Sequence, residues 1–369
     1  MKQGWEIKKI GEVVQKIFAG GDKPHMFSEQ QTDICCVPVY GNGVTNDGLC
    51  GYTDHYVVNE RSLTVSARGT VGYCCVRNEP FVPIVRLITI IPQESIGVEF
   101  LCYALSTIDI ENNGVAIPQL TVPMIKNVSI PVPPIEEQEK IVAELDCLSG
   151  IIEKKKQQLK ELDNLALSIF YEMFGDPVEN DKGWEKKRLD EIGKVITGNT
   201  PSTKDESNYS SADYCFVKPS DIAKDSISYI SNTEFYISEK AYVNSRQLPK
   251  GSVLTTCIGI IGKVGILQKD ATCNQQINAI IPNKDVDAKF LAHVLFMIRD
   301  ILTDVANAPI VPIINKKEFS SVSIPIPSFS LQQEFASKIE SIEKQKELIS
   351  QSIKETETLF NSRMDYYFG

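Results

Sequence analysis

Residue types that commonly perform catalysis are few in this sequence, and none has a partner motif. Of the three histidines, His25 and His55 lie in polar, turn-rich segments and His293 lies in an apolar helical stretch. Residues 257–264 resemble a phosphate-binding loop but lack its first glycine and the Ser or Thr after the lysine. Residues 40–43 have an incomplete nucleotide-loop pattern and indicate a turn. We therefore expect no catalytic residues in this chain.

Ten cysteines could in principle bind a metal ion, but their spacing argues against it. No pair shows the spacing of a zinc site, and most cysteines lie in apolar runs such as residues 34–37 and 72–76. We expect buried free thiols in a reducing compartment, and no metal site. The N-terminal segment has no apolar signal region, and no run reaches the roughly 18 apolar residues of a membrane span. These features predict a cytoplasmic protein.

An internal repeat organises the sequence. Residues 4–13 are similar to residues 183–192, and these segments contain the only two tryptophans. Residues 117–138 match residues 311–332 at an offset of 194 positions, and this offset continues without a gap to the last residue given, Gly369. The stretches between the tryptophan and proline motifs differ between the copies. The frame is therefore repeated, whereas the interiors have diverged.

Each copy ends in a proline-rich strand followed by a long helix. Residues 128–133 and 322–327 predict short strands, because proline cannot continue a hydrogen-bonded ladder. Apolar residues then recur at alternating spacings of four and three, the heptad pattern of paired helices. Polar residues interrupt this pattern at Lys155, Lys346, Thr356 and Arg363. The residues expected to pair the helices are Leu145, Leu148, Ile152, Leu159, Leu162, Ile169, Ile339, Ile342, Ile349, Ile353 and Phe360.

A helix over residues 135–175 or 329–369 would be about 60 Å long, whereas a domain of 130 residues is roughly 30 to 35 Å across. A helix with one bare apolar seam is not stable alone. We expect the two helices to pair as an antiparallel coiled coil with the globular domains at opposite ends. The alternative is that each helix packs on its own domain.

The expected fold class is α+β, with a pseudo-two-fold internal repeat. Short β-branched runs at residues 62–65 and 253–256 predict strands, and residues 100–106 and 290–302 predict helices. The predicted segments are a globular domain (1–134), a central spacer helix (135–175), a second globular domain (176–328) and a C-terminal spacer helix (329–369).

The net charge of -10 at first argues against nucleic acid binding. The two predicted helices contribute six of these ten negative charges, so the globular domains are close to neutral. Such a balance predicts weak non-specific DNA binding unless partner proteins contribute positive charge. The acidic helix faces are either docking surfaces or merely solvated.

Over its whole length the sequence resembles the specificity subunits of type I restriction-modification systems. In that family a Gly-Trp-Glu motif begins each target-recognition domain, and a Pro-x-Pro-Pro-x-x-x-Gln segment leads from it into a long helix. The first motif is present here as Gly4-Trp5-Glu6 and again as Gly183-Trp184-Glu185, and the second as Pro131-Val132-Pro133-Pro134 with Gln138. Phe174-Gly175-Asp176-Pro177 lies between the two copies.

The resemblance implies a non-catalytic subunit with two DNA-binding domains. Each domain would recognise one half of a bipartite target in double-stranded DNA, and the paired helices would set the gap. The partners implied are two methyltransferase subunits and restriction/translocase subunits. Adenosylmethionine, ATP and magnesium would belong to those partners, and no cofactor is expected in this chain.

Recognition of DNA requires polar side chains at base edges, in addition to phosphate contacts. In residues 66–72, glycines would let backbone amides approach a phosphate beside Arg68. The alternative is a tight turn between buried strands. The candidate DNA-binding residues are Arg68, Gly69, Thr70, Lys23, Asn42, Thr45, Lys218, Ser220, Arg246 and Lys263.

Two other functions remain open from the sequence. A coiled-coil scaffold or adaptor with two protein-interaction domains and no DNA binding would also explain the helices and the acidic charge. An enzyme hidden in one domain is the other alternative. The sequence contains no methyltransferase signature, because it has neither a glycine-rich cofactor loop nor an Asn-Pro-Pro-Tyr motif.

Overall fold

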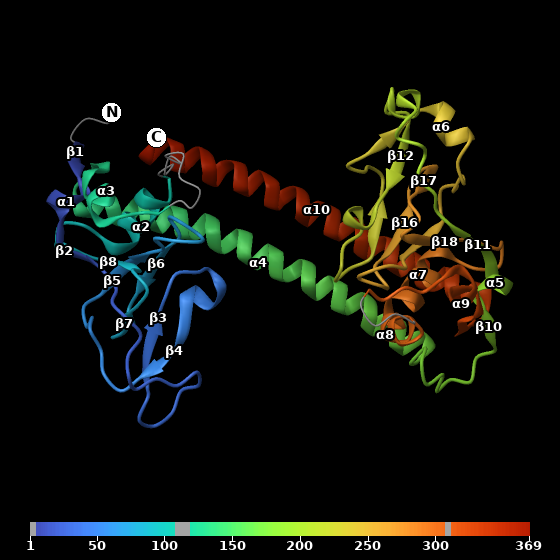
Figure 1. Ribbon diagram of the computed structural model, residues 1–369, viewed down its shortest axis with the longest axis horizontal. Coiled ribbons are helices and arrows are strands. Elements are labelled where there is room, and N and C mark those ends of the chain that lie inside the picture. The colour runs from blue at the N-terminus through green and yellow to red at the C-terminus, as the bar shows by residue number, and fades with distance from the viewer. Residues whose placement is uncertain (1–4, 108–118, 307–310) are drawn as a thin grey trace. The chain divides into compact units, whose positions relative to one another are not determined.

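The computed structural model describes residues 5–107, 119–306 and 311–369, which fall into two compact units. Unit 1 comprises Met1–Lys156 and Gln351–Gly369, and unit 2 comprises Gln157–Ser350. Helices α4 (Ile135–Phe174) and α10 (Phe329–Phe368) each contribute to both units (Figure 1). The predicted spacer helices are thus shared by the compact units. Gly4 and residues 117–118 of the repeat lie outside the described residues.

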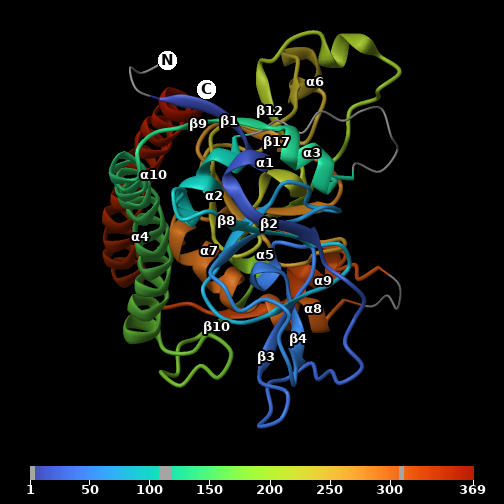
Figure 2. The same cartoon turned by 90° about the vertical axis from the view of Figure 1, so that its left-hand side faces the viewer.

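Unit 1 combines small sheets with short helices. Its strands are β1 (Glu6–Lys9), β2 (Val14–Ala19), β3 (Val37–Tyr40), β4 (Leu49–Thr53), β5 (Ser62–Val65), β6 (Cys74–Arg77), β7 (Val82–Pro83), β8 (Ile88–Pro92) and β9 (Ser129–Val132). Its short helices are α1 (Ile10–Val13), α2 (Val98–Ser106), α3 (Val122–Asn127) and the 3-10 turn η1 (Thr45–Gly48). Among the described residues, the strands pair in the orders β2-β8-β5-β6, β4-β3-β7 and β1-β9. The sheet of β3 and β4 extends away from that of β2 and β8 (Figure 2).

Unit 2 repeats this plan with additional elements. Its strands are β10 (Lys186–Arg188), β11 (Gly193–Thr197), β12 (Tyr214–Val217), β13 (Ser228–Ile230), β14 (Tyr236–Ile237), β15 (Val253–Thr256), β16 (Val264–Leu267), β17 (Ala271–Cys273), β18 (Ile277–Pro282) and β19 (Ser323–Pro325). Its helices are α5 (Leu189–Ile192), α6 (Glu239–Val243), α7 (Ala288–Met297), α8 (Arg299–Asp304), α9 (Lys316–Ser321), η2 (Glu206–Tyr209) and η3 (Pro219–Asp221). The described strands pair as β11-β18-β15-β16-β13, β14-β12-β17 and β10-β19.

These elements confirm the α+β class and several local predictions. The strands expected at residues 62–65 and 253–256 are β5 and β15, and both are buried throughout. The helix expected over residues 290–302 is instead two helices, because the backbone departs from helical geometry at Ile298 between α7 and α8. The prediction of buried thiols was wrong for Cys36, Cys50 and Cys147, which are exposed. Cys36 precedes β3, and Cys147 lies on the solvent side of α4.

The two framing motifs are hydrogen-bonded to each other in each unit. β1, which follows the first tryptophan, pairs antiparallel with the proline strand β9, and β10 pairs in the same way with β19. Prolines are tolerated there because each sheet is a two-stranded ribbon in which every strand is an edge. The repeated segments therefore close the two ends of each variable interior against one another.

A buried glutamine at the start of each long helix fastens it to its unit. Gln138 donates from Nε2 to the carbonyl oxygens of Ser95 (3.0 Å) and Pro133 (2.8 Å) and accepts from the Gly97 amide (2.9 Å). Gln332 donates to the Pro327 carbonyl and accepts from the Asp287 amide, both at 2.9 Å. Buried side-chain amides with these partners fix the orientation of each helix start relative to its unit, since each unmade hydrogen bond in a buried site is costly.

Segments of α4 and α10 pack against each other within each unit. In unit 1, Arg363 Nη2 lies 2.8 Å from Glu144 Oε2, and Lys155 Nζ lies 2.6 Å from Ser352 Oγ and 3.2 Å from Thr356 Oγ1. Residue numbers rise along α4 as they fall along α10, so the segments run antiparallel. Three of the four polar interruptions of the heptad pattern therefore make contacts between the helices.

The fourth interruption, Lys346, does the same in unit 2. Its Nζ lies 2.8 Å from Asp163 Oδ1 on α4 and 2.9 Å from Glu343 Oε1 on α10. The helices also pack on the globular part of the unit, because Phe170, Phe174 and Phe335 form one aromatic cluster with Phe290 of α7.

The residues expected to pair the helices are all buried or half-buried. The buried ones are Leu145, Ile152, Ile339, Ile342 and Ile353. The half-buried ones are Leu148, Leu159, Leu162, Ile169, Ile349 and Phe360. In unit 1, Leu145 and Phe360 also pack with Phe100 of α2. Pairing between helices and packing on the globular part, posed as alternatives from the sequence, thus occur together.

Candidate nucleic-acid interface

A glycine-rich loop occupies equivalent positions in the two units. It joins β5 to β6 in unit 1 and β15 to β16 in unit 2. Its closing hydrogen bonds run from Gly72 N to Ser66 O (2.9 Å) and from Ser66 N to Tyr73 O (2.9 Å), and in unit 2 from Gly262 N to Thr256 O (3.1 Å) and from Thr256 N to Lys263 O (3.0 Å). Gly69 and Gly259 both have positive φ, 70° and 76°. The backbone is therefore shared, whereas Arg68 and Thr70 correspond to Ile258 and Ile260.

Asn42 connects this loop to a second and a third loop in unit 1. Its Oδ1 accepts a hydrogen bond from the Ala67 amide, and its Nδ2 donates one to the Val85 carbonyl, both at 2.7 Å. The amide thus has an internal role that the sequence did not indicate. We call residues 20–23, 42–48, 66–73 and 84–86 loop cluster 1.

The other sequence candidates of the first domain also lie on loop cluster 1. Arg68, Gly69 and Thr70 are exposed, and Arg68 Nη2 lies 3.3 Å from Gln119 Oε1. Thr45 is exposed at the start of η1. Lys23 is exposed, with its Nζ 3.4 Å from the centre of the Phe27 ring. These positions place cationic and hydroxyl groups where a polyanion could reach them.

The candidates of the second domain gather in the same way on residues 198–200, 218–221, 246, 256–263 and 274–276, which we call loop cluster 2. Lys263 donates from Nζ to the Pro219 carbonyl, between Lys218 and Ser220. Burial lowers the pKa of Lys263. Arg246 is exposed, and its Nη1 lies 2.6 Å from the Thr197 carbonyl oxygen.

Within loop cluster 2, the two remaining candidates differ in their surroundings. Lys218 Nζ lies 3.0 Å from the centre of the Phe235 ring, a cation-π geometry. Ser220 is exposed in η3. The four positively charged or polar candidates of the second domain thus lie on neighbouring loops.

Both loop clusters contain one further element that was not among the sequence candidates, the turn that follows β7 and β17. Two hydrogen bonds of this turn recur in both units. One joins the first residue of the turn to the neighbouring strand, and the other spans the turn. They run from Ile84 N to Tyr40 O (2.9 Å) and Leu87 N to Ile84 O (3.0 Å), and from Asn274 N to Val217 O (3.1 Å) and Ile277 N to Asn274 O (3.3 Å). No glycine or proline lies within the turn itself to signal it. Residues 84–87 and 274–277 are 190 positions apart, the same offset that relates the two glycine-rich loops. This common offset was the available signal in the sequence.

A glycine lets the chain cross close behind this turn in each unit. A Cβ on Gly20 would lie 2.6 Å from the Pro83 carbonyl oxygen. A Cβ on Gly198 would lie 2.2 Å from the carbonyl oxygens of Cys273 and Asn274. Any other residue would displace the turn, so these glycines fix its position.

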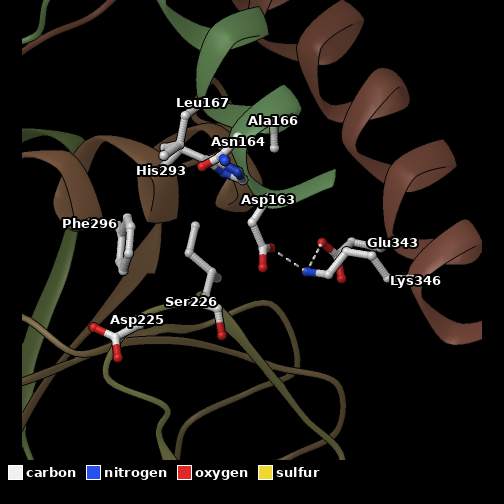
Figure 3. A pocket seen from close by; sticks show the side chains of 11 residues that line it. Asp163, Asn164, Ala166, Leu167, Asp225, Ser226, His293, Phe296, Glu343 and Lys346 are labelled. Carbon is white, nitrogen blue, oxygen red and sulfur yellow. Dashed lines mark hydrogen bonds and ion pairs between the residues drawn. The ribbon is translucent and has the colours of Figure 1, made fainter. Parts of the chain in front are cut away.

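A small pocket of unit 2 lies beside the helices and holds an ion cluster. Figure 3 shows Asp163 and Glu343 facing the Lys346 ammonium, with His293 nearby. Burial raises the pKa of Glu343. Burial opposes the charge of Lys346, but hydrogen bonds to Asp163 and Glu343 raise its pKa overall. The pocket volume of about 80 Å³ is well below the roughly 300 Å³ of typical small-molecule sites. We interpret the cluster as structural.

His293 shows no catalytic geometry. Its Nδ1 donates to the Lys289 carbonyl oxygen of the same helix at 2.7 Å, and its ring meets Phe335 edge-on at 4.9 Å. Burial lowers the pKa of His293 to about 4. In the part of the chain that the structure describes, no group of three His, Cys, Asp or Glu residues could hold a metal ion. No helix in the same residues is long and apolar enough to span a membrane.

The chain thus consists of two similar α+β units in which a repeated frame holds diverging loops. The family model described as the type I restriction modification DNA specificity domain matches residues 2–164 and 181–358. The chain therefore belongs to this family.

Individual relatives agree with this assignment. A putative type I specificity subunit of Mycoplasma pneumoniae is 36% identical over 171 residues, 43% of this chain and 51% of the relative. A specificity subunit of a type I restriction enzyme of Methanocaldococcus jannaschii is 35% identical over 42% of this chain and 37% of that protein. These two alignments span 51% and 37% of the length of those relatives, so less than two thirds of each is covered.

A solved structure covers more of the chain. The S subunit of a type I restriction-modification system from M. genitalium superposes with a TM-score of 0.61 at 13% identity, covering 99% of this chain and 96% of that one. At this identity the likeness concerns the fold alone.

Proposed function

We propose that this chain is the specificity subunit of a type I restriction-modification complex. Each unit binds one half of a bipartite target in double-stranded DNA through its loop cluster. One observation carries the proposal: the same backbone frame carries exposed Arg68 and Thr70 in one unit, and half-buried Ile258 with exposed Ile260 in the other. A shared frame with different side chains suits two half-sites of different sequence.

The chain itself is proposed to be non-catalytic and to need no cofactor. The methyltransferase and restriction/translocase subunits would bind adenosylmethionine, ATP and magnesium. We further propose that the complex works in the cytoplasm. The near-neutral globular parts require that these partners supply much of the positive charge for DNA binding.

The long helices offer surfaces on which methyltransferase subunits could dock. On α10, the side chains of Leu348, Leu359 and Tyr366 are 64%, 50% and 57% exposed, and on α4 Leu165 is 47% exposed. Leu348, Leu359 and Tyr366 are 11 and 7 positions apart and therefore lie along one side of α10, where a partner could cover them together. This pattern favours docking over a merely solvated acidic face.

The experiment is to express the chain with its methyltransferase partner in a cell that lacks other DNA methylation, and to sequence the methylated positions. We expect one motif of two defined halves separated by undefined bases. Deleting one heptad from each helix, residues 154–160 and 349–355, should change the gap and leave both halves intact, because both helices continue from one unit into the other. A changed half-site would contradict the spacing role of the helices, and the absence of methylation and DNA binding in the intact complex would favour a scaffold.

A further inference from the structure

The turn after β7 is held in an unusual backbone conformation in unit 1. Val85 and Arg86 have φ values of 52° and 62°, which non-glycine residues seldom adopt and β-branched residues least of all. The surrounding chain imposes this conformation through hydrogen bonds. They run from Val85 N to Gly21 O (2.8 Å), from Arg86 N to Gly20 O (3.1 Å) and from Asn42 Nδ2 to Val85 O (2.7 Å).

The strained turn presents its side chains outward. Val85 is 53% exposed and Arg86 is exposed. Within residues 5–107 and the other described ranges, the Arg86 guanidinium makes no hydrogen bond, ion pair or ring contact. A guanidinium whose backbone is fixed but whose donors are unused is arranged to bind a group outside the chain.

The equivalent turn in unit 2 carries a different polar side chain. Gln275 is exposed and corresponds to Val85 at the offset of 190, and Gln276 corresponds to Arg86. The Thr200 hydroxyl donates to Gln275 Oε1 at 2.7 Å and orients the amide. Gln276 is half-buried, and its Oε1 accepts a hydrogen bond from Asn274 Nδ2 at 3.0 Å. Gln275 is therefore the glutamine of this turn that is exposed to solvent.

Arginine and glutamine both have forked end groups that can make paired hydrogen bonds to a single base. Arginine pairs with guanine O6 and N7, and glutamine with adenine N6 and N7. We propose that Arg86 and Gln275 are specificity-determining residues, with Arg86 contacting a guanine in one half-site and Gln275 an adenine in the other. The inference rests on the proposed function, since it names the residues that distinguish bases within each half-site.

The test uses the full chain with its methyltransferase partner and compares the methylated motif of the wild type with those of Arg86→Gly, Arg86→Lys and Gln275→Ala. Arg86→Gly removes the side chain and places at φ 62° the residue that tolerates it best, so folding is not weakened. We expect Arg86→Gly to reduce the preference for one guanine about tenfold or more while the other half-site is unchanged. Gln275→Ala should do the same for one adenine in the other half-site.

The control variant is Lys16→Ala, which removes an exposed cation on β2 outside loop cluster 1 and should leave the motif unchanged. An unchanged motif in Arg86→Gly overturns the inference, although a bipartite wild-type motif would still support the proposed function. Uniformly weaker methylation that Arg86→Lys restores would place Arg86 on a phosphate and also overturn it. A wild-type complex without a bipartite motif would contradict the proposed function itself.

Discussion

Protonation of His293 should make unit 2 less stable as the pH falls from 7 to 5. In the folded chain burial lowers the pKa of this imidazole to about 4, whereas 6.5 is its ordinary value. Below pH 6.5 the unfolded chain therefore binds a proton that the folded chain excludes, and stability decreases until the pH reaches about 4. From the difference of the two pKa values, the loss is about 2 kcal/mol between pH 7 and pH 5 and about 3 kcal/mol in all.

The assay is urea unfolding at several pH values, followed by the fluorescence of Trp184 in a Trp5→Phe background, since the chain has two tryptophans. The variant His293→Leu keeps an apolar side chain beside Phe335 and removes the titrating group. Between pH 7 and pH 5, the free energy of unfolding of this variant should fall by about 2 kcal/mol less than that of the parent. His25→Gln, which replaces an exposed histidine, is the control. Equal pH dependence in the parent and in His293→Leu would refute this account of the buried ring.

Three further perturbations test other contacts. Lys346→Met leaves the carboxylates of Asp163 and Glu343 without their cation. Because this ion cluster is only partly buried, the loss should destabilise unit 2 by about 1 to 2 kcal/mol in urea unfolding. An unchanged unfolding midpoint would contradict this. Gln332→Leu removes two buried hydrogen bonds and should cost about 2 to 3 kcal/mol, whereas Gln333→Leu, at an exposed position, should cost little; equal effects would argue against a fastening role. Leu348→Glu and Leu359→Glu should weaken methyltransferase binding in a pull-down at least about tenfold without lowering Tm, and undiminished binding would exclude these faces as docking surfaces.

Periodic features of the sequence translated into structure because they depend on local geometry. The heptad spacing gave the extent of α4 and α10, and the proline motifs gave β9 and β19. The interruptions of the heptads were informative as well, but only the structure shows why. Lys155 and Arg363 stand where apolar residues were expected because each has a polar partner on the facing helix.

Features that depend on distant pairing could not be obtained from spacing. The orders β2-β8-β5-β6 and β11-β18-β15-β16-β13 join strands that are far apart in the chain. Asn42 looked like a surface residue because its partners, Ala67 and Val85, are remote in sequence. The turn at Val85 and Arg86 was missed because its conformation is imposed from outside and not by its own residue types.

The pairing of β1 with β9, and of β10 with β19, has a consequence in polymer terms. Each ribbon closes a loop of more than 100 residues, and the entropy cost of closing a flexible loop grows only with the logarithm of its length. The tryptophan motifs are offset by 179 positions and the proline motifs by 194, so the second interior is 15 residues longer. Lengthening a loop of this size by 15 residues costs only about 0.1 kcal/mol of closure free energy. The ribbon thus tolerates insertions and deletions between its strands almost without thermodynamic penalty.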